Sequence, residues 1–154
     1  KWTLKLRKGV EFHNGKSMTA EDVIYSLNYH REENSKSIAR TLLKPVNDIR
    51  ADGQYTVVIQ LDQGNADFPA ILTDFHLVIV PHGTTDFDKG MGTGGYILEE
   101  FEPGVRVLSR RNPKGSRIYK LTSNKAKCFT KTMISTWGYP TQWPVHLQLA
   151  KISQ

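Results

Sequence analysis

Six glycine-rich residues, 90–95, contain the pattern Gly-x-Gly-x-x-Gly, which in dinucleotide-binding proteins cradles a phosphate. That chemistry needs a strand before the glycines, a helix after them and an acid about 20 residues further on. Here the strand-like segment 96–98 follows, and no acid lies beyond Glu102. We therefore interpret Gly92, Gly94 and Gly95 as a flexible turn that returns the chain to the sheet at Tyr96.

Five histidines are the next candidates for chemistry, but none forms a zinc spacing with a cysteine or with another histidine. We predict a turn role for His13, and an interaction with the helix dipole for His30 near a helix C-terminus. Phe75 and His76 lie at a predicted helix–strand junction, which could face a ligand cleft. Ordinary packing or a surface position remains the alternative. The sequence predicts no metal and no cofactor.

Catalytic pairs are not supported by the remaining polar residues. Glu99 and Glu100 are adjacent on a predicted strand, so their carboxylates point to opposite faces and cannot form an acid–base couple. No serine lies in a Gly-x-Ser-x-Gly context. Cys128 is the only cysteine, which excludes an intrachain disulfide. We predict that the chain is not an enzyme.

The elements that position these residues begin with a strand, a turn and a helix over residues 2–27. Apolar and polar residues alternate from Trp2 onward, which is typical of a half-buried strand. Asn14 and Gly15 favour a tight turn. Thr19 is a good helix N-cap, and Asp22 in the first turn approximates a capping box.

Further elements follow along the chain, and together they predict an α+β fold with a mixed sheet and a few flanking helices. Residues 46–50 and 55–61 form a predicted hairpin. Asp67 caps a predicted short helix whose Ile71, Leu72 and Phe75 face inward. Residues 77–80 are a predicted buried strand, too short to span a bilayer. A second hairpin is predicted for residues 96–101 and 105–110.

Charge divides the chain near residue 104. All 15 acids precede that residue, whereas residues 105–154 contain 10 of the 21 Lys and Arg and no acid. The aromatic residues Phe129, Trp137, Tyr139 and Trp143 lie among the basic residues of this end. The combination gives an alternative function, a small basic domain that contacts nucleic acid or an anionic membrane. Because residues 1–104 are net acidic, specific nucleic-acid binding is the weaker hypothesis.

Several of these motifs, in order, resemble the extracellular solute-binding proteins of family 5, which serve peptide and nickel ABC importers. The resemblance rests on residues 2–27, on 55–61 followed by 68–81, and on Gly92 to Tyr96 with the Phe101-Glu102-Pro103-Gly104 and Arg111-Asn112-Pro113 motifs. Gly95 stands where the family usually has Pro. The resemblance implies a two-lobed periplasmic binding protein that closes on a peptide or other small solute and delivers it to an ABC permease.

The resemblance also implies a division of the chain. We expect residues 1–113 to be part of the first lobe, and residues 114–154 to be a divergent or foreign basic tail, poorly packed from Ile118 onward. The chain opens inside a predicted strand, so we expect a fragment, and its missing signal carries no information on location. The resemblance implies that the main anchors for a peptide's charged ends lie largely on the other lobe, so we expect the fragment alone to bind ligand weakly or not at all. Family membership implies a periplasmic or extracytoplasmic site, with membrane association only through the transporter. Ligand identity and oligomeric state are not predicted.

Overall fold

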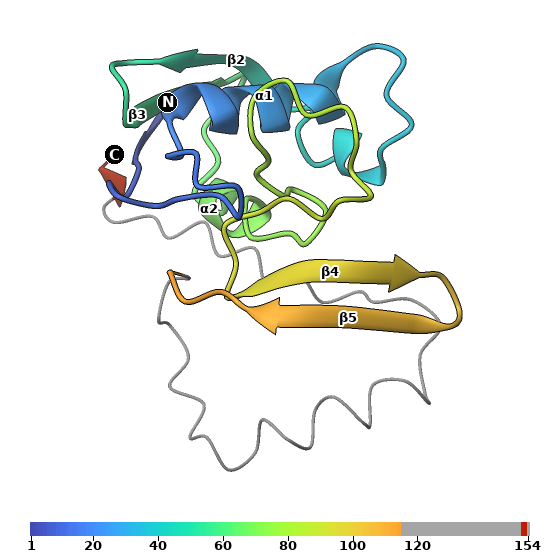
Figure 1. Ribbon diagram of the computed structural model, residues 1–154. Helices are drawn as coiled ribbons and strands as arrows, with labels where there is room; N and C mark the ends of the chain where they lie inside the picture. The colour runs from blue at the N-terminus through green and yellow to red at the C-terminus, as the bar shows by residue number, and fades with distance from the viewer. Residues whose placement is uncertain (115–151, 154) are drawn as a thin grey trace.

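A four-stranded sheet with one long helix packed on it forms the main body of the chain (Figure 1). The computed structural model describes residues 1–114 and 152–153. The predictions for the basic tail, for its aromatic residues and for Cys128 therefore lie outside the described residues. The predicted loose packing from Ile118 onward also lies outside the described residues, apart from residues 152–153.

The sheet has the strand order β2-β3-β1-β6, and every described pairing in it is antiparallel. Its strands are β1 (Trp2–Lys5), β2 (Val46–Ala51), β3 (Thr56–Leu61) and β6 (Ile152–Ser153). The α+β class is confirmed, although the described sheet is antiparallel where the sequence predicts a mixed one. Strand β1 lies between β3 and β6, with Trp2 opposite Ile59 and Leu4 opposite Ile152.

The predicted alternation decides which residues form the core. Trp2 and Leu4 of β1 are buried, as are Val57 and Ile59 of β3, whereas Lys5 is exposed. The turn between β2 and β3 is closed by a hydrogen bond from the Asp52 amide to the Thr56 carbonyl. The first predicted hairpin is thus confirmed.

Helix α1 (Ala20–Arg31) begins where the capping residues predict. Asp22, at the third helical position, accepts a hydrogen bond from the Thr19 backbone amide at 2.8 Å. Ala20, Val23 and Leu27 are buried, and the helix packs on β2 and β3. The apolar stripe of α1 thereby covers the sheet.

The Asn14–Gly15 turn is also confirmed. Gly15 has φ +83°, a backbone conformation that side-chain-bearing residues rarely adopt. The Asn14 side chain accepts a hydrogen bond from the Lys16 amide at 3.0 Å, and the Gly15 amide donates to the Phe12 carbonyl.

Two short helical segments, η1 (Ile38–Arg40) and α2 (Phe68–Ile71), differ in part from the predictions. The Asp67 side chain makes no capping hydrogen bond to α2, and the Asp67 amide instead donates to the Asn65 side chain. Phe75 is 49% exposed and does not face inward, because α2 ends at Ile71 and the chain turns at residues 74–77, where the Leu77 amide donates to the Asp74 carbonyl.

Residues 77–80 are largely buried but form no strand, contrary to the prediction. The Val80 amide donates to the Ser26 hydroxyl of α1 at 3.0 Å. Because this backbone donor is used by a side chain of the helix, it is not available to a neighbouring strand. Burial without strand pairing explains the apolar run that the sequence shows.

The second predicted hairpin forms, but it does not return to the main sheet. Strands β4 (Tyr96–Glu102) and β5 (Arg106–Arg111) make a separate two-stranded antiparallel sheet below the main body (Figure 1). Among the described residues, no helix has the length and apolar character needed to cross a bilayer.

Candidate functional site

An aromatic pair, the exposed Phe75 and the partly buried His76, is the candidate that the sequence singled out for ligand contact. The two rings lie 3.9 Å apart between centroids and are tilted by 33°. His76 Nδ1 lies 2.7 Å from an Asp74 carboxylate oxygen, which also accepts the His76 backbone N–H. Burial acts to raise the pKa of Asp74, but the hydrogen bonds and the charge of His76 outweigh it and lower the pKa.

This arrangement holds the imidazole at a fixed orientation beside a half-exposed phenyl ring. The Asp74 contact occupies one ring nitrogen, which is how carboxylates orient functional histidines. The pair therefore presents an apolar face and a polar ring edge from one short loop. It is suited to binding a mixed apolar and polar group.

His30 does not have the role that the sequence predicts. Its side chain is buried, and Nδ1 lies 2.6 Å from the Ser37 hydroxyl, which ties the end of α1 to the loop before η1. Burial, and to a lesser extent the nearby His76, lowers the pKa of His30. The neutral ring is thus favoured, so His30 is a packing residue and not a cationic partner of the helix dipole.

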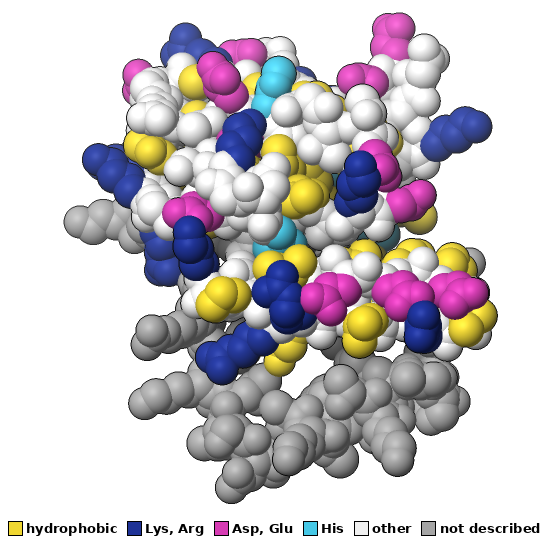
Figure 2. Space-filling view, viewed as in Figure 1, with side chains coloured by type: hydrophobic (Ala, Val, Ile, Leu, Met, Phe, Trp, Pro, Cys, Tyr) yellow, Lys and Arg dark blue, Asp and Glu magenta, His cyan; other side chains and the backbone are white. Residues whose placement is uncertain are grey.

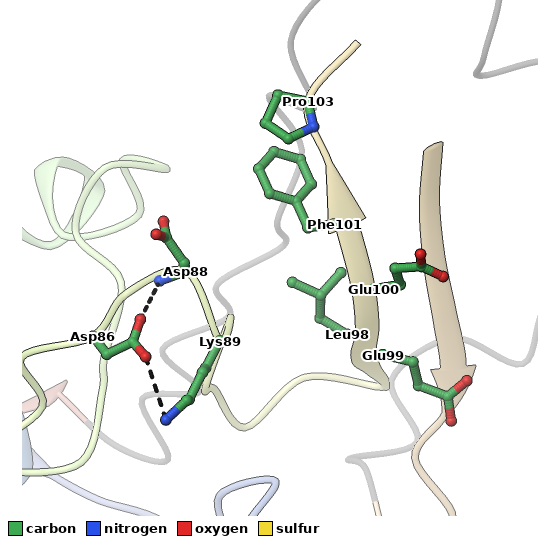
Figure 3. Close-up of a pocket in the computed structure, with 8 residues that line it drawn as sticks. All are labelled: Asp86, Asp88, Lys89, Leu98, Glu99, Glu100, Phe101 and Pro103. Atoms are coloured by element: carbon green, nitrogen blue, oxygen red, sulfur yellow. Dashed lines mark hydrogen bonds and ion pairs between the residues drawn. The ribbon is translucent and has the colours of Figure 1, made fainter. Parts of the chain in front are cut away.

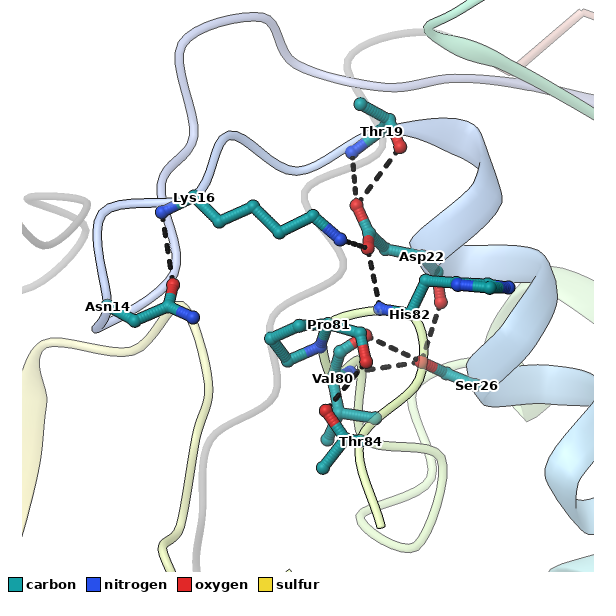
Figure 4. A network of polar contacts seen from close by, with 9 residues as sticks. All are labelled: Asn14, Lys16, Thr19, Asp22, Ser26, Val80, Pro81, His82 and Thr84. Atoms are coloured by element: carbon teal, nitrogen blue, oxygen red, sulfur yellow. Dashed lines mark hydrogen bonds and ion pairs between the residues drawn. The ribbon is translucent and has the colours of Figure 1, made fainter. Parts of the chain in front are cut away.

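The buried carboxylate of Asp22 joins the start of α1 to Lys16, in the preceding loop, and to His82, which is 60 residues away in sequence (Figure 4). It accepts hydrogen bonds from Lys16 Nζ at 2.6 Å and from the His82 backbone amide at 2.7 Å, in addition to the Thr19 amide. The side chain of Asp22 has no exposed surface. Burial acts to raise its pKa, but these hydrogen bonds, with Lys16 foremost, lower the pKa overall.

Beside Asp22, the Ser26 hydroxyl binds the segment that follows Leu77. It lies 2.7 Å from the Asp22 carbonyl and accepts the Val80 amide (Figure 4). Together the two residues attach residues 80–82 to the first half of α1. They make no nucleophile–base pair, since Ser26 contacts only backbone groups in the described part of the chain.

The glycine loop is attached to the Asn14–Gly15 turn through His13, a contact that sequence analysis missed. His13 Nε2 lies 3.1 Å from the Gly94 carbonyl, and the His13 amide donates to the Gly92 carbonyl at 2.9 Å. The Asn112 side chain donates to the same Gly94 carbonyl. A His-Asn-Gly sequence signals a turn, but no local spacing shows what the turn contacts 80 residues later.

The glycine loop leads directly into β4, and its glycines have a structural role. Gly90 has φ +55°, and a Cβ added there would lie 2.8 Å from a methyl group of Leu98. Glu99 and Glu100 of β4 each pair with an arginine of β5, Arg110 and Arg106 respectively. These acids stabilise the hairpin surface and form no acid–base couple.

An open hollow of about 550 Å³ lies between the 86–89 loop and β4 (Figure 3). Leu98 and Phe101 project toward the loop, whereas Glu99 and Glu100 both project away from it. The prediction that these two carboxylates point to opposite faces is therefore wrong, because the β4–β5 register shifts between Leu98 and Glu100 and interrupts the alternation. Within residues 1–114, no three His, Cys, Asp or Glu side chains cluster as a metal site would require.

Comparison with known proteins identifies the family to which the chain belongs. The sequence profile described as "Bacterial extracellular solute-binding proteins, family 5 Middle" matches residues 1–135. The chain belongs to this family. The match continues beyond Pro113, where the motifs that we identified in the sequence end.

Individual family relatives match over a limited share of their length. YhjP, an uncharacterized protein of Bacillus subtilis, is 34% identical over 107 residues, which are 70% of this chain and 18% of YhjP. The oligopeptide-binding protein AppA of Bacillus subtilis is 25% identical over 123 residues, or 72% of this chain and 23% of AppA. A solved structure, of the nickel ABC transporter from Bacillus halodurans, is 35% identical with a TM-score of 0.61, and the match covers 71% of this chain and 22% of that one. The chain thus spans about a fifth of the relatives that it matches.

Proposed function

We propose that this chain is a segment of the substrate-binding component of an ABC importer for peptides or related small solutes. The family match over residues 1–135 carries the proposal. An oligopeptide-binding protein and a nickel transporter among the relatives suggest the ligand classes, peptides and nickel complexes. In this function the chain acts on the extracytoplasmic side of the membrane and meets the bilayer only through its permease.

We assign ligand contact to Phe75 and His76. Their support is geometric, because Phe75 is 49% exposed and the His76 ring is held by Asp74. The turn and capping residues act as scaffold in this proposal and do not touch ligand. These are Asn14, Gly15, Thr19, Asp22, Gly92, Gly94, Gly95 and Tyr96.

Residues 1–113 form part of the first lobe in this proposal, and residues 114–154 form a divergent or foreign basic tail. A binding protein of this kind buries its ligand between two walls. The hollow beside β4 and the hollow lined by residues 29–37 are both open to solvent, and in this proposal the opposite wall belongs to the rest of a longer polypeptide. The 154-residue chain alone therefore has no micromolar affinity for peptides.

Calorimetric titration tests this function. The 154-residue chain and the polypeptide encoded by the complete reading frame are each titrated with di- and tripeptides and with Ni²⁺ in the presence of histidine. We expect binding heat only for the longer polypeptide. Micromolar peptide affinity of the short chain, or no binding of either ligand class by the longer one, would contradict the proposal.

Two substitutions in the longer polypeptide test the contact residues. Phe75→Ala and His76→Ala should each weaken binding about tenfold, equivalent to about 1.4 kcal/mol. His82→Ala is the matched control, since His82 is an exposed imidazole and its contact to Asp22 uses only the backbone amide. If Phe75→Ala and His76→Ala bind ligand as tightly as His82→Ala does, Phe75 and His76 do not contact the ligand.

A further inference from the structure

Strand β2 forms a free edge of the main sheet. In the order β2-β3-β1-β6 it is a terminal strand, and among the described strands it pairs only with β3. An edge strand presents unpaired backbone N–H and C=O groups, to which a further strand can add. The side chains that flank these groups decide which strand fits and in which register.

The hydrogen bonds of the β2–β3 hairpin show which backbone groups of β2 face this edge. The Asp52 amide donates to a carbonyl of β3 at 2.9 Å. Bonded pairs alternate along an antiparallel ladder, so Arg50 and Asp48 also turn their backbone groups toward β3. The amide and carbonyl of Ile49, between these two residues, therefore point to the free edge.

The end of the edge where β2 begins is already in use. Nη2 of Arg31, on α1, donates to the Val46 carbonyl at 2.8 Å and to the Asn47 carbonyl at 2.9 Å. The β2–β3 register also shifts between Val46 and Asp48, and such an irregularity twists a strand away from regular pairing. Regular addition of a strand is thus confined to a short stretch centred near Ile49.

Two exposed residues of opposite charge, Asp48 and Arg50, flank Ile49 on this stretch. Ile49 is part of the core, so alternation places the two charged side chains on the other face of the sheet. Neither side chain has an ion pair or hydrogen bond to another described residue. Figure 2 shows acidic and basic side chains interspersed over the visible face of the main body, so mixed charge alone singles out no surface. The distinction of β2 is that its two charges have a fixed spacing on a free edge.

This spacing makes the edge complementary to itself. Antiparallel pairing of two β2 strands about Ile49 places Asp48 of each copy opposite Arg50 of the other. Opposite charges directly across an antiparallel pair are stabilising, and like charges are destabilising. A pair centred on Asp48 or on Arg50 would instead bring like charges together. In the Ile49 register, the outward amide and carbonyl of each Ile49 bond to those of the other copy.

We propose that the β2 edge is an interaction surface for a second copy of this chain. The two main sheets then join into one continuous antiparallel sheet, with both α1 helices on the same face. Because one short strand from each copy makes the contact, the dimer is weak, with a dissociation constant on the order of 0.1–1 mM. Dimerisation goes beyond the proposed function, since it requires neither ligand nor permease.

Sedimentation equilibrium of the 154-residue chain, in a concentration series up to about 1 mM, tests the dimer. Asp48→Arg and Arg50→Asp should each weaken dimerisation at least tenfold, because each places like charges opposite one another at two positions. An equimolar mixture of these two variants should pair again, since each supplies the charge that the other lacks. Asp62→Arg is the matched control, because Asp62 is an exposed acid just beyond β3 and is not on the edge.

Three sedimentation results would overturn the proposal. These are a wild-type chain that stays monomeric throughout the series, single variants that pair as tightly as wild type, and a mixture of the two variants that stays monomeric.

Amide hydrogen exchange provides a second arm that needs no substitution. The Ile49 amide should exchange at least twofold more slowly at the highest concentration than at the lowest. The Arg50 amide, which already bonds to β3, should not change. A dimer that protects other amides but leaves Ile49 unprotected would assign the contact to a different surface and contradict the proposal.

Discussion

The Asp22 carboxylate offers the sharpest test of how the fold is held together. Asp22→Asn preserves the side-chain shape but replaces one of two acceptor oxygens with an NH₂ donor. If the amide oxygen stays near Thr19, the NH₂ group faces Lys16 and the backbone amide of His82, and neither can accept a hydrogen bond from it. Lys16 is 44% exposed and can turn to water, but the His82 amide cannot move freely.

The cost follows from these contacts. An unsatisfied buried N–H costs about 1–3 kcal/mol, and the remaining bond to Thr19 loses its charge assistance, about 1 kcal/mol more. The sum is about 2–4 kcal/mol. In a chain of this size it corresponds to a fall of about 5–15 °C in melting temperature.

Thermal and urea unfolding, followed by circular dichroism, measure this loss at pH 7. Glu21→Gln is the matched control, because Glu21 is the neighbouring acid in the first turn of α1 and is exposed. It should change stability by less than about 1 kcal/mol. Equal unfolding midpoints for Asp22→Asn and Glu21→Gln would refute the assignment of Asp22 as the residue that attaches the segment at His82 to α1.

The pH dependence gives an independent check of the same contact. The folded-state pKa of Asp22 lies below its usual value of 3.8, so its ionised form stabilises the fold above that pH. This stability is lost as the pH falls through the folded-state pKa. The difference in unfolding free energy between wild type and Asp22→Asn should therefore narrow as the pH falls below about 3.8, and an undiminished difference would show that the charge is not involved.

Three further predictions concern single contacts. Ser26→Ala leaves the buried amide of Val80 without its acceptor and should cost about 1–3 kcal/mol in urea unfolding, whereas no loss would mean that the amide finds another partner. Burial lowers the pKa of His30, so as the pH falls the unfolded chain takes up a proton on this residue before the folded chain does. The free energy of unfolding should therefore fall as the pH drops below about 6.5. His30→Asn should flatten this dependence of stability on pH, and an unchanged dependence would point to another group. His13→Ala should speed amide hydrogen exchange in the glycine loop around Gly92 while leaving α1 unchanged, and equal exchange rates would remove His13 as an anchor.

Local structure was predictable from this sequence because its signals are short-range. The Asn14–Gly15 turn and the Thr19 helix start depend on backbone preferences and on contacts within three residues. Both hairpins were also predicted, since alternation and turn residues lie side by side in the chain. These parts of the sequence specify their own conformation.

Long-range contacts account for what could not be predicted. The acceptor for the Val80 amide is a helix side chain 54 residues earlier, and this contact turns an apparent strand into an irregular buried segment. The Asp22 contact with His82 uses a backbone amide, which leaves no trace in residue type. Exposure of Phe75 and the separate position of β4 likewise depend on where the chain turns, which spacing alone does not determine.

The central position of β1 has a consequence for synthesis of the protein. This strand precedes its neighbour β3, which starts more than 50 residues later, at Thr56. Until that part leaves the ribosome, Trp2 and Leu4 have no surface against which to pack, and the apolar stripe of α1 is also uncovered. Nascent chains that contain β1 and α1 but end before Leu61 should therefore bind chaperones that recognise apolar segments, and release should follow completion of the β2–β3 pair.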